Sequence, residues 1–275
     1  MNETIKILTI QDISCYGQCS TTVALPILSH YGLETAILPS AILSTHTAGF
    51  KDFTVLDLTD EMPKIIDHWY HEGIKFDCIY TGYIGDKRQF DYILKCKDLL
   101  LNPKGLFIVD PAMADNGKLY PALNTEIIFG MRKLCMQADY IIPNITEGAF
   151  LTGNDYKEIQ DSEYINKLLK DLFDLGCKNV ILTGVQEDAD TIGAVAYDGI
   201  TRTYNIEVKE DKSYHGTGDI FSSIIVADIM NNKSIKDTLK HACRFVIDAI
   251  RKTSSDDTHS YGVKYEEVLR DEIKN

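Results

Sequence analysis

The segment SYHGTGDIF, residues 213–221, places two glycines around a threonine and continues with Asp219 and a run of apolar residues. The apolar run predicts a helix that begins here, and free N–H groups at a helix N-terminus bind anionic oxygen atoms. Glycine lets the backbone approach such a ligand closely, so we expect Gly216, Thr217 and Gly218 to form an anion hole. Asp219 would then take a proton from a hydroxyl group while the amides stabilise a phosphoryl group in transfer. The alternative is a glycine turn in which Asp219 only caps the helix.

Apolar runs alternate with helical patterns over most of the chain. Strands are expected at 6–13, 34–43, 76–85, 106–113, 138–146 and 179–185, and helices at 23–31, 60–72, 90–101 and 165–173. Most strands are continuous apolar runs, which is typical of a parallel sheet covered by helices on both faces. Residues 193–208 predict a hairpin around an Asp-Gly turn, and two helices are expected to close the chain before a partly loose tail after Ser254. The sequence therefore predicts an α/β fold, a three-layer α/β/α sandwich with a central, mostly parallel sheet, forming one domain over residues 1–275.

The composition excludes several classes of protein. The 275 residues carry 28 basic and 41 acidic side chains, for a formal net charge of −13, and such a surface repels nucleic acid. The N-terminus lacks the pattern of a signal peptide, and no apolar run is long enough to span a bilayer, so we expect no membrane partner. The seven cysteines are odd in number and follow no framework spacing, which indicates a reducing, cytoplasmic location.

Polar side chains follow the predicted strands at their carboxyl ends, where ligands bind in open α/β sheets. They are Gln11 and Asp12, Ser44 to Thr47, Thr81 to Tyr83, Asp110, Asn144 and Glu147, and Thr183 and Gly184. Each of them taken alone is more often a turn or capping residue, but together they are expected to converge on one edge of the sheet.

Four ordered motifs resemble the ribokinase-like superfamily over nearly the whole chain. GTGD resembles its signature, in which the aspartate is the catalytic base. The other three are DPAMADNGKLY (110–120), PNITEGAFLTG (143–153) and VILTG (180–184), which resemble segments of the vitamin kinases. Within the superfamily, LTIQDISCYGQCSTTVALPILSHYG (8–32), LSTHTAGF (43–50) and TGYIGD (81–86) resemble pyridoxal kinases. The Gly-Ser-Asp-x-x-Gly-Gly opening usual in hydroxymethylpyrimidine kinases is absent. The resemblance implies an ATP-dependent kinase that phosphorylates pyridoxal, pyridoxine or pyridoxamine in pyridoxal phosphate salvage.

The resemblance also implies roles for individual residues. Asp219 would be the general base on the 5′-hydroxymethyl group, and the backbone of Gly216–Gly218 would hold the transferred phosphate. The ATP phosphates would lie by Asp110, Asn144, Glu147, Thr183 and Gly184, with Mg²⁺ near Asp110 and Glu147. Thr47 and Tyr83 would contact the pyridine ring. A K⁺ requirement stays open, and the family implies a homodimer.

One residue departs from the family pattern. Asp12 stands where pyridoxal kinases have a serine after the first glutamine. A carboxylate beside the pyridine nitrogen or the 3-hydroxyl group would favour a more cationic vitamer such as pyridoxamine.

Two other functions and several other candidate sites are alternatives to the kinase and its site residues. A hydroxymethylpyrimidine kinase or another ribokinase-like kinase is the alternative enzyme, and a ligand-binding protein without turnover is the alternative of a different class.

Cys15 with Cys19, and His68 with His71, lack the further ligands that a metal site needs, so incidental or surface roles are favoured. For His46 and His215 a ligand contact and a loop hydrogen bond both stay open. Asn116-Gly117 is a turn signal in a segment that forms a flap over the nucleotide in pyridoxal kinases, and the flap is expected to be short.

Overall fold

A nine-stranded sheet runs through the computed structural model, which describes residues 4–47, 49–121, 123–256 and 258–274. The strand order is β11-β10-β9-β8-β5-β4-β1-β2-β3. Neighbours from β2 to β9 pair in parallel, whereas β3, β10 and β11 pair antiparallel at the two ends. The strands are β1 (Lys6–Ser14), β2 (Glu34–Leu43), β3 (Val55–Asp57), β4 (Phe76–Thr81), β5 (Leu101–Val109), β8 (Tyr140–Ile141), β9 (Val180–Val185), β10 (Thr191–Tyr197) and β11 (Arg202–Val208).

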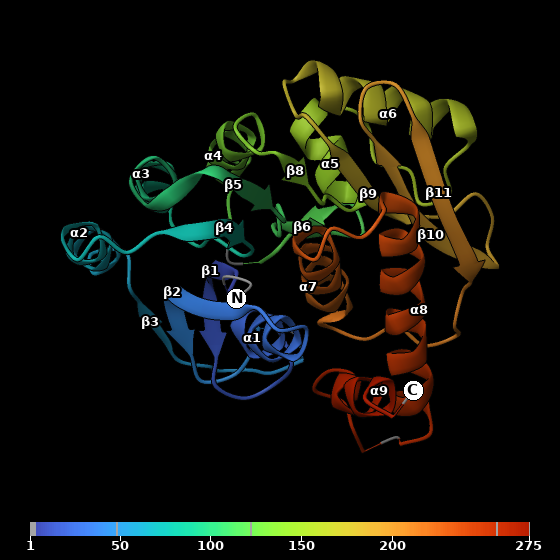
Figure 1. Ribbon diagram of the computed structural model, residues 1–275. Helices are drawn as coiled ribbons and strands as arrows, with labels where there is room; N and C mark the ends of the chain where they lie inside the picture. The colour runs from blue at the N-terminus through green and yellow to red at the C-terminus, as the bar shows by residue number, and fades with distance from the viewer. Residues whose placement is uncertain (1–3, 48, 122, 257, 275) are drawn as a thin grey trace.

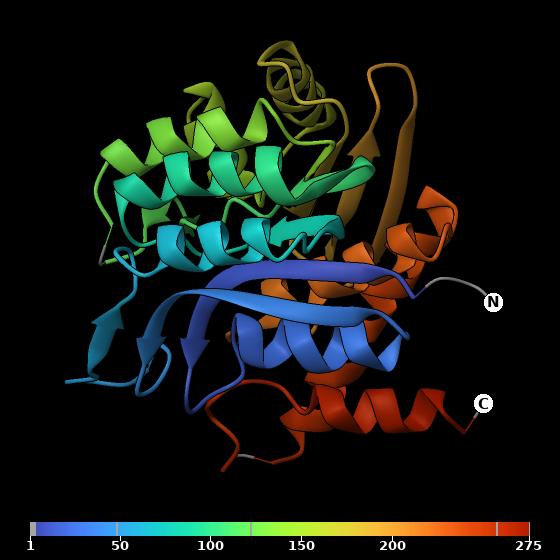
Figure 2. The same ribbon diagram turned by 60° about the vertical axis from the view of Figure 1, so that its left-hand side comes forward.

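Helices cover both faces of this sheet (Figures 1 and 2). One face carries α2 (Met62–His71), α3 (Lys87–Leu100), α4 (Glu126–Cys135), α5 (Ile145–Thr152) and α6 (Ser162–Asp174). The other carries α1 (Thr21–His30), α7 (Thr217–Met230), α8 (Ile235–Ser254) and α9 (Tyr265–Glu272). The predicted fold class, a mostly parallel sheet between two helical layers, is confirmed.

The two hydrophobic cores follow from the alternation of side chains along buried strands. In β1, Ile7 packs with the layer of α1 and α7, whereas the next residue, Leu8, packs with the layer of α2 and α3. In β5, Ile108 packs with the layer of α1 and α7, whereas Phe107 packs with the layer of α2 and α3. Because both faces of each central strand are buried, the strands read as continuous apolar runs in the sequence.

The structure differs from the predicted elements in several places. The strand expected at 138–146 is limited to Tyr140–Ile141, because Pro143 cannot donate a ladder hydrogen bond and Asn144 already caps α5. The tail after Ser254 contains α9, whose Tyr265 and Leu269 are buried. The turn predicted at Asn116-Gly117 is present, but it joins two short strands that were not predicted, β6 (Ala114–Asp115) and β7 (Lys118–Leu119).

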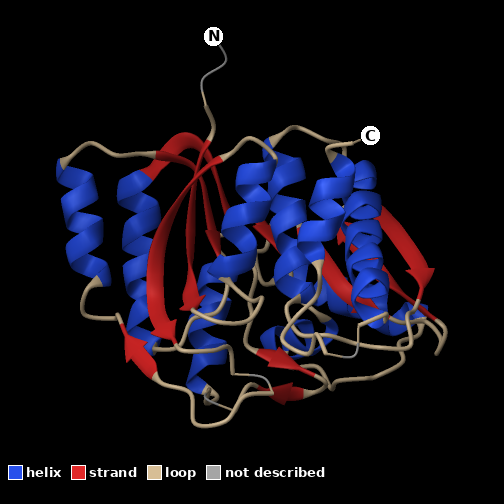
Figure 3. Cartoon of the chain, turned by 90° about the horizontal axis from the view of Figure 1, so that it is seen from below, coloured by secondary structure: helices blue, strands red, loops and turns tan. Residues whose placement is uncertain are grey.

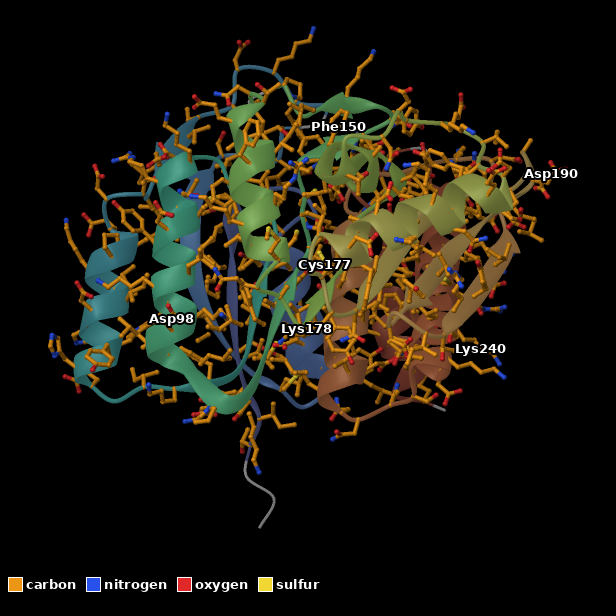
Figure 4. All side chains as sticks on the ribbon, turned by 90° about the horizontal axis from the view of Figure 1, so that it is seen from above. Asp98, Phe150, Cys177, Lys178, Asp190 and Lys240 are labelled. Carbon is orange, nitrogen blue, oxygen red and sulfur yellow. The ribbon has the colours of Figure 1, made fainter. Side chains whose placement is uncertain are left out.

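The carboxyl ends of the parallel strands point to one edge of the molecule. Figure 3 shows the strand arrowheads and most of the connecting loops at this edge, with the two chain termini at the opposite one. The β6-β7 hairpin lies among these loops. The outer surfaces of the helical layers carry charged side chains such as Asp98 on α3 and Lys240 on α8 (Figure 4). Functional side chains that follow strands are therefore gathered at the edge with the loops.

Candidate active site at the carboxyl edge of the sheet

The start of α7 is built around a glycine that no other residue can replace without strain. Gly216 is the N-cap residue with φ 83°, and a Cβ atom placed on it would lie 2.0 Å from the carbonyl oxygen of Gln18. A Cβ atom on Gly218 would meet nothing within 4 Å, so the space in front of this first turn is open. The predicted anion hole thus has amides at a helix N-terminus and room for a ligand beside them.

Asp219 lies half-buried in this first turn, beside the open space. Gly216, not Asp219, occupies the N-cap, and the backbone amide of Ser20 at the start of α1 acts to lower the pKa of Asp219. Burial raises the pKa of Asp219 to about 7, and the negative charge of Asp12 acts in the same direction. The carboxyl group is therefore poised to exchange a proton near neutral pH, as a general base requires.

Asp12 lies near both Asp219 and Tyr83. Asp12 sits at an irregularity of β1, is 4% exposed, and accepts a hydrogen bond from the Ser14 hydroxyl group at 3.0 Å. Burial raises its pKa, and the hydroxyl groups of Ser20 and Ser14 act in the opposite direction. Burial, with the charge of Asp12, raises the pKa of Tyr83 to about 12. The third predicted ring contact, Thr47, is exposed on the loop between β2 and β3.

Asp110 and Glu147 form a second pair of carboxyl groups at this edge. Asp110 follows β5 and accepts a hydrogen bond of 2.6 Å from the Ser222 hydroxyl group of α7. Glu147 is 2% exposed and accepts hydrogen bonds from the backbone amides of Met113, at 3.0 Å, and Asn144, at 2.9 Å. Burial raises the pKa of both groups; the charge of Asp219 adds to the effect on Asp110, and that of Asp110 to the effect on Glu147.

Asn144, Thr183 and Gly184 lie next to this pair. Asn144 and Glu147 close a capping box at the start of α5, and the Asn144 amide group donates to the carbonyl oxygen of Ala114 at 2.8 Å. Thr183 pairs with Asn144 through an isolated parallel bridge, and Gly184 follows with φ 69°. The residues predicted to bind ATP are thus brought to one edge, although Asn144 and Glu147 also have a structural role there.

The two buried carboxyl groups fit a magnesium ion that arrives with a nucleotide. In proteins Mg²⁺ takes one or two carboxylates and completes its shell with water and substrate phosphates. Burial raises the pKa of Asp110 and Glu147, because it disfavours their ionised forms. A nearby cation would stabilise those ionised forms. Over the described ranges, no group of three or more His, Cys, Asp or Glu side chains could hold a metal ion by itself, and this includes Cys15 with Cys19 and His68 with His71.

Three side chains of the site were not predicted from the sequence, and the roles of two histidines were left undecided. Ser20, Ser222 and Tyr120 contact or surround the acidic groups. Ser20 lies in the segment 8–32 and Tyr120 ends DPAMADNGKLY, but neither was predicted as a site residue. His46 is buried and its Nε2 lies 3.2 Å from the carbonyl oxygen of Tyr261, the loop hydrogen bond that was one of its two alternatives. His215 is exposed. Ser222 carried no sequence signal because its partner, Asp110, comes from another element.

Comparison with known proteins agrees with this geometry. The phosphomethylpyrimidine kinase family matches residues 26–264. The chain belongs to this family. It is also 36% identical to a protein of Bacteroides thetaiotaomicron assigned as a phosphomethylpyrimidine kinase, with a TM-score of 0.94 over 99% of this chain and 95% of the other. A second crystal form of that protein, described with pyridoxal, superposes with a TM-score of 0.92 over 98% and 96% of the two chains.

Pyridoxal kinases are similar as well. The enzyme of Lactobacillus plantarum is 30% identical, with a TM-score of 0.89 over 97% of this chain and 95% of the other. The pyridoxal kinase of Dictyostelium discoideum is 29% identical over 80% of this chain and 77% of its own. The predicted resemblance to pyridoxal kinases is therefore confirmed. Among the described residues, no helix combines the length and the apolar character needed to cross a membrane.

Proposed function

We propose that this protein transfers the γ-phosphoryl group of ATP to the 5′-hydroxymethyl group of a B6 vitamer. The observation that carries the proposal is the placement of Asp219, whose pKa is raised to about 7, at the open N-terminus of α7. The family membership and the similarity to a protein described with pyridoxal give the substrate class.

Asp219 is the general base in this proposal. Its ionised carboxylate accepts the proton of the acceptor hydroxyl group as that oxygen attacks the γ-phosphorus, and ADP leaves. The amides of Gly216, Thr217 and Gly218 donate hydrogen bonds to the phosphoryl oxygens in transfer, with the positive end of the α7 dipole behind them. The pKa of about 7 keeps a sufficient fraction of Asp219 ionised at neutral pH and leaves it basic enough to accept a proton.

The nucleotide would lie over the ends of β8 and β9. Asn144, Thr183 and Gly184 line this part of the edge, with Asp110 and Glu147 beside them. Asp110 and Glu147 would hold Mg²⁺ together with the phosphates, and the ion would neutralise phosphate charge. A requirement for K⁺ in addition to Mg²⁺ is tested by measuring ADP release with and without K⁺.

The vitamer would lie between Asp12 and Tyr83, with Thr47 on the loop above β2. Asp12 is proposed to favour a cationic vitamer, because its carboxylate is the charged group of the site next to Tyr83. Comparing kcat/KM for pyridoxal and pyridoxamine tests this. A strong preference for pyridoxal that is unchanged in Asp12→Ser would contradict it.

The enzyme is further proposed to be a cytoplasmic homodimer. All seven cysteines are free thiols, as expected of a protein kept in a reducing compartment. Light scattering after size exclusion measures the oligomeric state, and a monomer at micromolar concentration would contradict the dimer.

One assay decides between this function and its alternatives. ADP release is measured with ATP and Mg²⁺ over a panel of pyridoxal, pyridoxine, pyridoxamine, hydroxymethylpyrimidine and ribose, with Asp219→Asn as the control. Turnover of a B6 vitamer that is lost in the variant supports the proposal. Turnover of hydroxymethylpyrimidine alone would support the second candidate, which the family description favours. Binding of a vitamer without ADP release would indicate a binding protein.

A further inference from the structure

Two neighbouring serines on α7 use their hydroxyl groups in different ways. Ser223 donates to the carbonyl oxygen of Asp219, one helical turn back, at 2.6 Å, which is a common way for a helix to satisfy a buried serine. Ser222 is 2% exposed and donates outside its own helix, to Oδ2 of Asp110, also at 2.6 Å. This second hydrogen bond joins two buried residues that lie 112 positions apart in the chain.

The side chain of Asp110 has this hydrogen bond as its anchor. The backbone amide of Asp110 donates to the carbonyl oxygen of Thr81 at 2.9 Å, which continues the pairing of β5 with β4. Within the part of the chain that the structure describes, Ser222 is the only group that forms a hydrogen bond with the Asp110 carboxylate. The orientation of that carboxylate therefore depends on Ser222, and Oδ1 is left able to bind a ligand.

Glu147, the other carboxyl group of the pair, is held in a different way. Its Oε1 accepts from the backbone amide of Met113 at 3.0 Å, and its Oε2 accepts from that of Asn144 at 2.9 Å. Both oxygen atoms of Glu147 are thus fixed by the main chain, and the loss of one side chain would not release them. Asp110 is the member of the pair whose orientation a single hydroxyl group controls.

Ser222 also connects Asp110 to the helix that carries the proposed base. Ser222 follows Asp219 by three residues, and residues three apart lie on one face of a helix. The anion hole of Gly216–Gly218 belongs to the first turn of the same helix. Through Ser222, the Asp110 carboxylate is therefore fixed relative to α7 as well as to β5. Such relative placement is what phosphoryl transfer depends on.

We propose that Ser222 is a positioning residue for Asp110: its hydroxyl group holds Oδ2, leaves Oδ1 to bind Mg²⁺, and keeps the carboxylate in a fixed relation to the N-terminus of α7. The inference rests on the proposed function, in which Asp110 holds Mg²⁺ together with the nucleotide. It goes beyond that function because it assigns a role to a side chain outside the proposed ligands. Loss of a hydrogen bond that orients a metal ligand lowers metal affinity by about 10- to 100-fold.

The test measures the Kd of ADP by isothermal titration calorimetry, in EDTA and over a series of Mg²⁺ concentrations. In Ser222→Ala, the Mg²⁺ concentration that gives half of the effect on ADP binding should rise by about 10- to 100-fold. The Kd of ADP in EDTA should stay that of the wild type, because the hydroxyl group acts through the metal-binding carboxylate. A role in stability alone would not change the dependence on Mg²⁺.

Ser223→Ala is the matched control. It removes an equally buried hydroxyl group from the next position of the same helix, but the acceptor of that group is a main-chain oxygen. The Mg²⁺ dependence of this variant should therefore equal that of the wild type. If Ser222→Ala does not fold, Ser222→Cys carries the same prediction, since a thiol has a similar size and is only a weak donor.

A Mg²⁺ dependence that is unchanged in Ser222→Ala, or shifted equally in Ser223→Ala, would overturn the inference. The failure of the proposed function looks different. If Asp219→Asn keeps full activity, Asp219 is not the base, and if Asp110→Ala responds to Mg²⁺ as the wild type does, Asp110 does not hold the metal. If Asp110→Ala loses the response while Ser222→Ala keeps it in full, only the role of Ser222 fails.

Discussion

Gly216 and Gly218 stand two residues apart at the start of α7, and alanine should affect them in opposite ways. At Gly216, φ is 83° and a Cβ atom would lie 2.0 Å from a backbone carbonyl oxygen, that of Gln18. The left-handed conformation costs a non-glycine residue about 1–2 kcal/mol. Because the contacted atom belongs to the backbone, relieving the overlap costs about 1–3 kcal/mol more. Gly216→Ala should therefore destabilise the protein by about 2–5 kcal/mol.

At Gly218 the same methyl group would meet nothing within 4 Å. Alanine is the better helix former, so the free energy of unfolding should stay the same or rise by up to about 1 kcal/mol. The methyl group would, however, occupy the open space where phosphoryl oxygens approach the amides. Losing one such donor lowers kcat by roughly 10²-fold, so Gly218→Ala should be stable but nearly inactive.

Thermal unfolding and ADP release measure the two effects separately. Gly216→Ala should lower Tm by roughly 5–15 °C, while Gly218→Ala keeps the wild-type value. A Gly216→Ala protein as stable as the wild type would refute the packing of Gly216 against Gln18. A Gly218→Ala enzyme with normal kcat would refute the anion hole.

Three more predictions follow from the acidic groups and from a buried histidine. Asp219→Asn should lower kcat by about 10²–10⁴-fold without loss of Tm. The kcat/KM of the wild type should rise with pH through about 7, because the base acts in its ionised form. ADP release measures both effects, and a kcat/KM that does not change with pH would contradict the second prediction. Burial raises the pKa of Asp110 above its unfolded value of about 4, so the folded state binds this proton more tightly and that contribution to stability is lost as pH rises. Without nucleotide, Mg²⁺ should accordingly raise Tm more at pH 8 than at pH 6, and equal increments in wild type and Asp110→Asn would count against a metal role. Burial alone would lower the pKa of His241, but hydrogen bonds to Asp228 and Glu272 outweigh it and raise the pKa to about 9. The contribution of His241 to the free energy of unfolding is therefore complete below about pH 6.5 and is lost as the pH rises towards 9. The Tm difference between wild type and His241→Gln should shrink over that range.

The apolar runs at 6–13, 34–43 and 179–185 correspond closely to β1, β2 and β9, because parallel strands covered by helices need apolar side chains. The run at 106–113 matches β5 less well, since that strand covers Leu101–Val109. Short elements such as β8 and the hairpin of β6 and β7 pair over only two residues, and such elements depend on neighbours that the local sequence does not reveal.

The sequence by itself determined the fold class, the helix that starts after Gly216, and the edge at which Asp12, Asp110 and Asp219 would meet, since apolar periodicity and glycine chemistry are local properties. Only the tertiary structure decided which groups act on those carboxylates. The hydroxyl group of Ser222 reaches Asp110 across more than a hundred residues of chain. Burial, hydrogen bonding and neighbouring charge set a pKa, and each depends on what packs nearby in space and not on what stands nearby in sequence.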